Sequence, residues 1–276
     1  MTEIKPGPIG VFDSGYGGLT VFKEIVKHLP GYDYIYLGDN ARVPYGNRSF
    51  ETVYHYTLEC VEKLFELNCK LVILACNTAS AKALRTIQQN DLVKRDELIR
   101  VLGVIRPTTE IIGTMTHSKH VGIFATQGTV DSQSYVIEVK KFFPDLNIFQ
   151  EACPMWVPLV ENNEHQSAGA DYFIKKHVER LLSQSPDIDT ILLACTHYPL
   201  LIHKIQQHLP KNIRLVSQGE IVARSLVDYL HRHPEIDALC SRNEKITYYT
   251  TESVDDFDNK AQLFLGSKVH SRLLTL

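Results

Sequence analysis

Two cysteines occupy the same kind of position in two similar stretches of the sequence. Cys76 lies in "LVILACNTAS" (71–80) and Cys195 in "LLACTHYPLL" (192–201), each after an apolar run and before polar residues. A thiolate can act as nucleophile, as metal ligand or as a base that abstracts a proton. Because each cysteine is expected where a helix begins, and helix N-termini lower the pKa of a thiol, we expect a lowered pKa for both.

The other cysteines give no sign of a metal site or of disulfides. No two cysteines form a CxxC pair, and no group of Cys and His has the spacing of a zinc site. Cys60, Cys69 and Cys240 are expected to be small buried apolar residues. We therefore expect no metal and no cofactor, and this leaves the two repeated thiols to be explained.

Paired thiols suit one kind of chemistry in particular. If one thiol lies on each side of a substrate, one can remove a proton from a carbon while the other returns a proton to the opposite face. This is two-base inversion of a stereocentre, and it needs an acid and a base of matched type. A single cysteine nucleophile would instead need a histidine base and an oxyanion hole, with no second thiol.

The rest of the chain alternates short apolar strands with amphipathic helices. "IGVFDSG" predicts a buried strand that ends in a Gly-rich turn, and "TVFKEIVKHL" a helix with Phe22, Ile25, Val26 and Leu29 on one face. Strands are also expected at "YDYIYLGD", "KLVILA" and "IRVLGVI". This alternation predicts α/β domains of three layers with mainly parallel sheets.

The pattern then restarts. "HVGIFATQGTV" (120–130) resembles "PIGVFDSGYGG" (8–18), which aligns Asp13 with Ala125 and the two Ala-Cys segments with each other. Any two strand–helix units look alike, but the paired Ala-Cys favours a duplicated unit. We expect two pseudo-symmetric domains, with the active site in the cleft between them. The first spans residues 1–102 plus 213–276 and the second spans residues 103–212.

Short polar residues gather at the expected strand ends, where open parallel sheets bind ligands. Taken singly, each is also a typical helix cap. Their joint occurrence at four strand ends favours a small anionic or zwitterionic substrate bound by hydroxyls, amides and backbone N–H groups. The residues in question are Asp13, Ser14, Asn77, Thr78, Thr126, Thr129, Thr196 and His197, together with the turn "VPYG" (43–46).

Composition excludes other classes. Hydrophobic content of 44%, charged content of 22% and a net charge of −3 are typical of a globular protein without a nucleic-acid surface. No aliphatic run approaches the ~20 residues that span a bilayer, and "MTEIKPGPIG" lacks the apolar stretch of a signal peptide. We expect a cytoplasmic protein with no membrane contact. No dinucleotide or P-loop motif is present.

Six segments together resemble glutamate racemases, cofactor-independent enzymes that supply D-glutamate for the bacterial cell wall. They are "GVFDSGYGGLTV" (10–21), "YLGDNARVPYG" (36–46), "ILACNTASA" (73–81), "VGIFATQGTV" (121–130), "EACPMWVPLVE" (151–161) and "LLACTHYPLL" (192–201). The resemblance implies two α/β domains, glutamate as the substrate and a homodimer.

The resemblance also implies roles for individual residues. Cys76 would take the α-proton from D-glutamate and Cys195 from L-glutamate. Asp13 and His197 would assist them, and Glu151 would be a further acidic residue near the site. Substrate binding is expected from Asp13, Ser14, Pro44, Tyr45, Gly46, Cys76, Asn77, Thr78, Thr126, Thr129, Cys195, Thr196 and His197.

Two positions depart from the family pattern, and three alternatives remain. Arg106 stands where an acidic or small residue is expected, and Ser217 where Asp is frequent. The alternatives are an aspartate or hydantoin racemase, a non-catalytic amino-acid-binding protein, and a thiol hydrolase using Cys195 and His197. Binding alone needs neither thiol, and a hydrolase leaves Cys76 unexplained.

Overall fold

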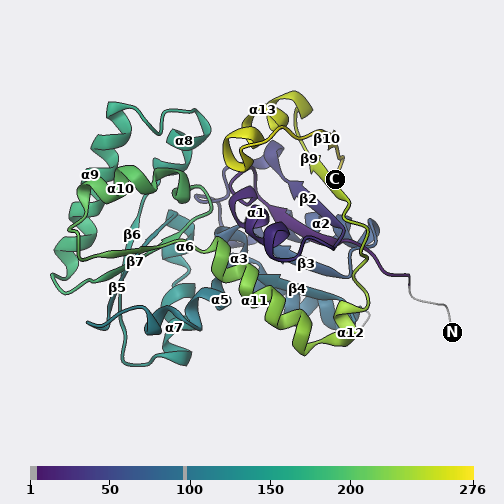
Figure 1. Ribbon diagram of the computed structural model, residues 1–276, viewed down its shortest axis with the longest axis horizontal. Coiled ribbons are helices and arrows are strands. Elements are labelled where there is room, and N and C mark those ends of the chain that lie inside the picture. The colour runs from purple at the N-terminus through teal and green to yellow at the C-terminus, as the bar shows by residue number, and fades with distance from the viewer. Residues whose placement is uncertain (1–4, 96–97) are drawn as a thin grey trace.

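The computed structural model describes residues 5–95 and 98–276 and contains two parallel β-sheets, each with helices on both faces (Figure 1). The predicted α/β class with parallel sheets is therefore confirmed. The strands are β1 (Ile9–Asp13), β2 (Tyr34–Gly38), β3 (Leu71–Leu74), β4 (Arg100–Gly103), β5 (His120–Ala125), β6 (Asn147–Ala152), β7 (Thr190–Ala194), β8 (Arg214–Val216), β9 (Ile246–Thr250) and β10 (Ser271–Leu273).

The two sheets repeat one strand order. The first sheet is ordered β10-β9-β2-β1-β3-β4 and the second β6-β5-β7-β8, and every strand pairing within them is parallel. If β5 is matched with β1, the order β2-β1-β3-β4 recurs as β6-β5-β7-β8. In both sheets the order reverses between the first and third strands of the unit, so a crevice opens there at their carboxyl ends.

The chain passes between the sheets twice. It leaves the first sheet after β4 and returns after β8, and β9 then pairs with β2. The expected domain boundary at residue 212 comes too early, because β8 pairs with β7 in the second sheet. With only three residues, β8 gives too short an apolar run for the sequence to assign it to a sheet.

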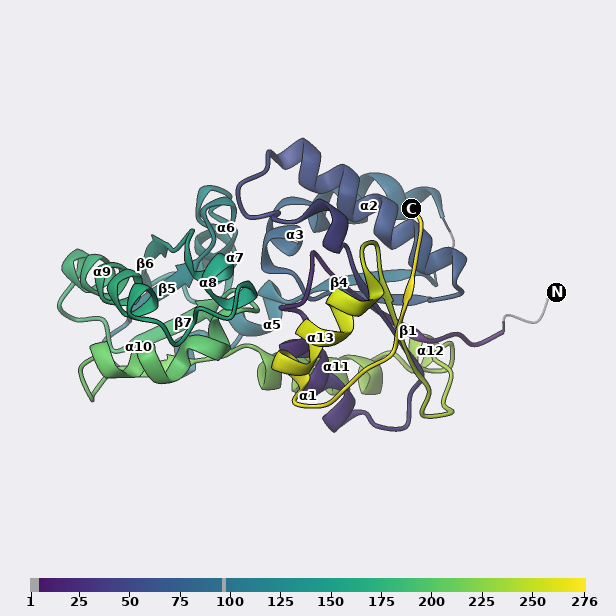
Figure 2. The ribbon, with the colours of Figure 1, turned by 90° about the horizontal axis from the view of Figure 1, so that it is seen from above.

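Helices complete the three layers of each domain. In Figure 2, α2 and α3 lie on one side of the first sheet and α1, α11 and α13 on the other. The helices are α1 (Leu19–His28), α2 (Phe50–Glu66), α3 (Asn77–Lys82), α4 (Leu84–Thr86), α5 (Ile105–Thr109), α6 (Gln127–Asp131), α7 (Ser134–Phe142), α8 (Trp156–Glu161), α9 (Ala168–Gln184), α10 (Ile202–His208), α11 (Gly219–Arg232), α12 (Pro234–Asp237) and α13 (Val254–Leu265).

Strand side chains alternate between these layers, as a period of two requires. In β1, Ile9 and Val11 pack in the cluster formed with α1, α11 and α13, while Phe12 packs in the cluster formed with α2 and α3. Burying a large apolar side chain contributes about 1.5–3 kcal/mol. The cluster that contains α1 continues into the second domain as far as Trp156, so the two domains share part of their core.

Candidate active site

The repeated strand order brings the predicted residues to corresponding places. Asp13 ends β1, and Cys76 follows the neighbouring strand β3. In the second sheet Thr126 follows β5, and Cys195 follows the neighbouring strand β7. Each pair therefore lies at the reversal point of its own sheet, which is the usual ligand-binding edge of such folds.

Cys76 is the N-cap residue of α3. Its thiol lies 3.4 Å from the hydroxyl of Ser14, to which it donates, and its sulfur accepts the Ala79 backbone N–H at 3.4 Å. Only 6% of Cys76 is exposed. Ser14 thus joins the turn after β1 directly to the thiol after β3.

The lowered pKa expected for Cys76 is wrong. Burial and the nearby Asp13 carboxylate raise the pKa of the Cys76 thiol to about 12, although its hydrogen bonds with Ser14 and Ala79 act in the opposite direction. α3 has only six residues, so its N-terminal field does not outweigh the loss of water. Cys76 is therefore held as a neutral thiol at physiological pH. The charge of Cys195 also acts to raise this pKa.

Cys195 belongs to a chain of polar contacts. Its sulfur lies 4.0 Å from Nδ1 of His197, and Nε2 of His197 lies 2.9 Å from a carboxylate oxygen of Glu161. Burial opposes the charged imidazolium, but the contacts with Cys195 and Glu161 prevail and raise the pKa of His197 to about 10. His197 therefore keeps a proton at neutral pH, beside the sulfur of Cys195.

Asp13 is fully buried at the end of β1. One carboxylate oxygen accepts the Gly15 backbone N–H at 2.9 Å, while the other has no hydrogen-bond partner among the described residues. Burial raises its pKa, with the charge of His197 acting against it. A buried, half-satisfied carboxylate beside a thiol is suited to binding an ammonium group or accepting a proton.

The glycines of the "DSGYGG" turn allow the two domains to approach. A methyl group on Gly17 would lie 2.3 Å from Nδ1 of His197 and 2.4 Å from Oγ1 of Thr196. Thr20, at the start of α1, donates to the Thr196 carbonyl oxygen at 2.9 Å. The first-domain turn is thus packed directly on the residues that follow Cys195.

Further contacts join the two domains between the segment after β3 and the segment after β5. The hydroxyls of Thr78 and Thr126 lie 3.0 Å apart, and Thr126 also contacts Thr129 at 3.1 Å and caps α6. The backbone N–H of Gly128 donates to the Gly46 carbonyl oxygen at 2.7 Å. These contacts bring Thr78, Thr126, Thr129 and the "VPYG" turn together at the junction.

Three predicted residues, Glu151, Pro44 and Tyr45, have surroundings that differ from those expected for a substrate contact. Glu151 pairs with Nδ1 of His177 at 2.6 Å. Pro44 is exposed, and the hydroxyl of Tyr45 donates to Asp39 at 2.5 Å, so the Tyr45 side chain supports its own loop. Asn77 accepts a hydrogen bond from the Tyr135 hydroxyl, also at 2.5 Å.

The two departures from the family pattern have the following surroundings. Arg106 is exposed, pairs with Glu110 at 2.8 Å and has its guanidinium over the Phe142 ring. Ser217 lines a cavity of about 860 Å³ beside α1 and α11. Neither residue contacts Cys76 or Cys195 through an ion pair or hydrogen bond in the described part of the chain.

Sequence reasoning missed Glu161, which pairs with His197, and named Glu151 as the further acidic residue near the site. Both glutamates lie in the segment "EACPMWVPLVE", but only Glu161 ends α8. A carboxylate at a helix C-terminus is electrostatically unfavourable, so its presence there was a signal of another role. Sequence reasoning also missed Tyr135 and Gln218, which form a buried chain of hydrogen bonds with Asn77.

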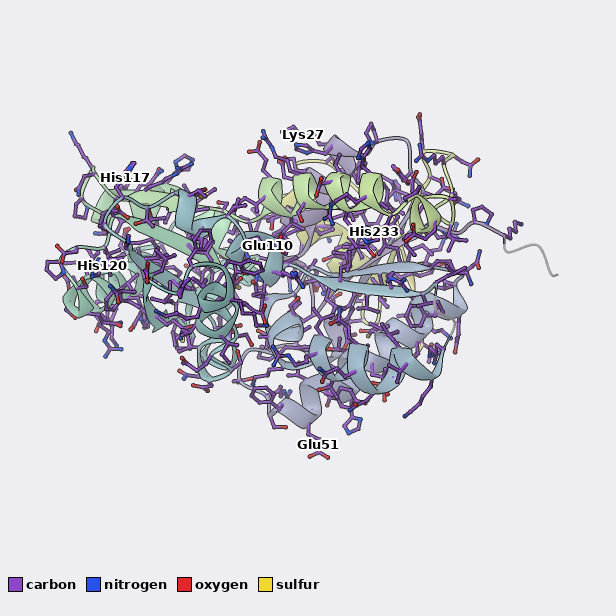
Figure 3. All side chains as sticks on the ribbon, turned by 90° about the horizontal axis from the view of Figure 1, so that it is seen from below. Lys27, Glu51, Glu110, His117, His120 and His233 are labelled. Carbon is purple, nitrogen blue, oxygen red and sulfur yellow. The ribbon has the colours of Figure 1, made fainter. Side chains whose placement is uncertain are left out.

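The site differs from the surface in its burial. Figure 3 labels Glu51 at the outer edge of the first domain and His117 at that of the second, and both side chains project into solvent. By contrast, Asp13, Cys76, Cys195 and His197 are all buried. Within residues 5–95 and 98–276, no three His, Cys, Asp or Glu side chains gather as metal ligands, and no helix is long and apolar enough to cross a membrane.

Known proteins match this chain over nearly its whole length. A family model described as Asp/Glu/Hydantoin racemase matches residues 9–226. A glutamate racemase from Geobacter metallireducens is 39% identical over 261 residues, covering 95% of this chain and 93% of the relative. A crystal structure of a glutamate racemase isoform from Bacillus anthracis superposes with a TM-score of 0.88 at 33% identity, covering 98% of each chain.

A second solved structure was determined with an amino acid bound. The glutamate racemase from Francisella tularensis, crystallised in complex with D-glutamate, superposes with a TM-score of 0.86 at 27% identity and covers 98% of each chain. The repeated strand order places the two thiols at corresponding strand ends. The chain belongs to the Asp/Glu/hydantoin racemase family and, within it, to the glutamate racemases.

Proposed function

We propose that the protein interconverts L- and D-glutamate by a two-base mechanism in which Cys76 and Cys195 exchange the α-proton. Cys76 takes the proton from D-glutamate, and Cys195 takes it from L-glutamate. The observation that carries the proposal is the recurrence of a thiol after the third strand of each repeated unit. The turn after β1 contacts Cys76 through Ser14 and lies against His197 at Gly17, so it joins the two thiol-bearing segments. Each thiol then serves one face of the α-carbon.

The protonation state of Cys76 suits the conversion of L-glutamate to D-glutamate. Cys76 is held as a thiol by burial, so it is ready to donate a proton after Cys195 has taken one from L-glutamate. The C–H electron pair stays on the α-carbon as the proton moves to Cys195, and the Cys76 S–H then supplies the new C–H bond. In the reverse direction, Cys76 must first lose its proton, and the Asp13 carboxylate accepts it. One oxygen of Asp13 has no hydrogen-bond partner among the described residues, and burial raises the pKa of this carboxyl group.

Other residues take supporting roles in this proposal. His197, protonated and paired with Glu161, stabilises negative charge on the Cys195 sulfur. Short hydroxyls and amides at the strand ends bind the two carboxylates of glutamate. The proposal uses no cofactor, because both proton transfers are made by side chains.

Isotope exchange tests the proposal. Each glutamate enantiomer, incubated with the protein in deuterated water after treatment with a chelator and without pyridoxal phosphate, should exchange its α-hydrogen and lose optical purity. Cys76→Ser and Cys195→Ser should each abolish racemisation. If either variant racemises at the wild-type rate, the two-base assignment is wrong. Aspartate assayed in parallel distinguishes glutamate from the aspartate alternative.

The single variants also separate the roles of the thiols. With Cys76→Ser, Cys195 can still remove and return the proton of L-glutamate, so exchange without inversion should persist for the L enantiomer only. Cys195→Ser should leave exchange for the D enantiomer only. Exchange of D-glutamate only in Cys76→Ser, and of L-glutamate only in Cys195→Ser, would reverse the assignment.

We further propose that the protein is a cytoplasmic homodimer that supplies D-glutamate for peptidoglycan. The resemblance of the six segments to glutamate racemases supports this role. Expression in a bacterium that requires external D-glutamate should remove the requirement, and the Cys76→Ser variant should not. Sedimentation equilibrium should give twice the 31.4 kDa mass of the chain.

A further inference from the structure

A buried chain of hydrogen bonds ends on the residue next to Cys76. Nε2 of Gln218 lies 2.7 Å from the Tyr135 hydroxyl oxygen, and that hydroxyl lies 2.5 Å from Oδ1 of Asn77. Gln218 is 4% exposed, Tyr135 is fully buried and Asn77 is 2% exposed. The mechanism above gives Gln218 and Tyr135 no part, so their burial needs another explanation.

The three residues come from different parts of the fold. Asn77 opens α3 in the first domain, and Tyr135 lies on α7 beside the second sheet. Gln218 lies just after β8, where the chain returns to the first domain. Its Nε2 also contacts the Val104 carbonyl oxygen at 3.2 Å and the Thr108 hydroxyl at 3.0 Å. Both residues follow β4, where the chain leaves the first domain. The chain of hydrogen bonds therefore contacts both segments that connect the two domains.

The chemistry of the groups sets the direction of each bond. An amide nitrogen only donates, so the Tyr135 oxygen accepts from Gln218 and its single hydrogen is free for Asn77. Oδ1 of Asn77 accepts that hydrogen. The orientation of the Asn77 amide is thereby fixed, with the oxygen toward Tyr135 and the nitrogen turned away from it.

The amide nitrogen of Asn77 is left without a partner. Nδ2 is buried and makes no hydrogen bond among the described residues. A buried donor without an acceptor is unfavourable and uncommon in native proteins. It is expected where a ligand supplies the acceptor, and Asn77 directly follows Cys76.

We propose that Gln218 and Tyr135 are positioning residues that hold the Asn77 amide with its N–H donors toward a substrate carboxylate. The proposal rests on the proposed racemisation and on Asn77 as a substrate contact. Because Tyr135 belongs to the second domain, the donors are fixed only while the two domains are together. Substrate binding is thus linked to the contact between the domains.

Removing either the Tyr135 hydroxyl or the Gln218 amide should free the Asn77 amide to rotate. In Tyr135→Phe the Asn77 oxygen loses its donor, and in Gln218→Met the Tyr135 hydroxyl is free to rotate. Both substitutions keep the approximate side-chain volume. The KM for both glutamate enantiomers should rise about 10-fold, the size expected when one hydrogen bond to a charged group is lost. The double variant should be no worse than Tyr135→Phe alone, because both changes act through Asn77.

Kinetics and binding are measured together with matched controls. Gln207→Met and Tyr172→Phe make the same chemical changes at exposed positions and should leave KM unchanged. Each test variant is also made with Cys76→Ser, and its affinity for glutamate is measured by calorimetry. This arm does not need turnover, so it separates a failure of positioning from a failure of the proposed reaction.

The outcomes are distinct. The proposal is supported if Tyr135→Phe and Gln218→Met each weaken glutamate binding and the double variant is no weaker than Tyr135→Phe alone. Neither substitution should have a further effect when Asn77 is already replaced by Ala. Unchanged affinity in folded Gln218→Met, or effects that add to those of Asn77→Ala, overturns it. If Tyr135→Phe does not fold, Gln218→Met decides alone. A purely structural role would lower the melting temperature and leave affinity and KM unaltered.

Discussion

Nε2 of His197 lies 2.9 Å from the carboxylate of Glu161, and Nδ1 of the same ring lies 4.0 Å from the sulfur of Cys195. The imidazole is thus held between a carboxylate and a thiol, and it is 4% exposed. This arrangement fixes the ring orientation and keeps its proton in place. It also makes Glu161, which no motif singled out, the partner of a residue beside the reacting sulfur.

Glu161→Gln should therefore reduce activity strongly. The amide keeps the shape but removes the charge that raises the pKa of His197, so kcat/KM should fall about 10²-fold, a typical loss for a disturbed acid–base group. Glu151→Gln is the matched control, because Glu151 pairs with His177, and it should stay within about threefold of wild type. The two kcat/KM values, measured with L-glutamate, check this, and equal losses would contradict the assignment.

Alkaline pH should weaken the folded state through His197. Its pKa is about 10 in the folded protein, against an ordinary value of about 6.5 in the unfolded chain. The contribution is fully present below pH 6.5 and is lost as pH rises through 10, so the free energy of unfolding should fall between pH 7 and 9. Urea unfolding at pH 7 and at pH 9 measures this difference in the free energy of unfolding. The difference should be smaller in Glu161→Gln, and an equal or larger difference there would refute the cause given.

Gly17→Ala should damage the site without contact to substrate. The added methyl would lie 2.3 Å from the His197 ring, so the ring or the turn must move. Such overpacking costs about 1–3 kcal/mol of stability, and kcat should fall with it. Gly31→Ala is the control, since a methyl there meets nothing within 4 Å. Kinetics and thermal unfolding of both variants provide the comparison. A fully active Gly17→Ala protein would show that this contact is dispensable.

Thr126→Ala should separate capping from binding. Thr126 caps α6 and contacts Thr78 across the junction, whereas Ser167 only caps α9. Losing either cap should cost about 0.5–2 kcal/mol of unfolding free energy. Only Thr126→Ala should also raise the KM for glutamate. The test compares KM and urea midpoints for Thr126→Ala and Ser167→Ala. A similar KM in both variants would leave Thr126 with a capping role alone.

The sequence by itself was sufficient for the local and repeated features. Apolar strands alternating with amphipathic helices predicted the α/β class, because these periods arise from local backbone geometry. The repeated Ala-Cys segments predicted two corresponding strand ends, and the structure has both at the reversal points of their sheets. The resemblance carried by the six segments indicated the racemase family, which the matched relatives confirm.

Only the tertiary structure decided which side chains meet. Glu151 and Glu161 are ten residues apart in one segment, and choosing between them required knowing which one faces the ring of His197, 36 residues beyond Glu161. The assignment of β8 to the second sheet likewise depends on its pairing with β7. Strand partners and facing side chains are set by long-range packing, which a local pattern does not encode.

The charge states were decided in the same way. Position at a helix start predicted a lowered pKa for Cys76, but its pKa is raised to about 12 because the folded chain buries the thiol and brings Asp13 beside it. The chain of hydrogen bonds from Gln218 through Tyr135 to Asn77 joins residues from three separate parts of the fold. The sequence determined which chemical groups stand at each strand end, whereas burial and distance, which exist only after folding, decided how those groups behave.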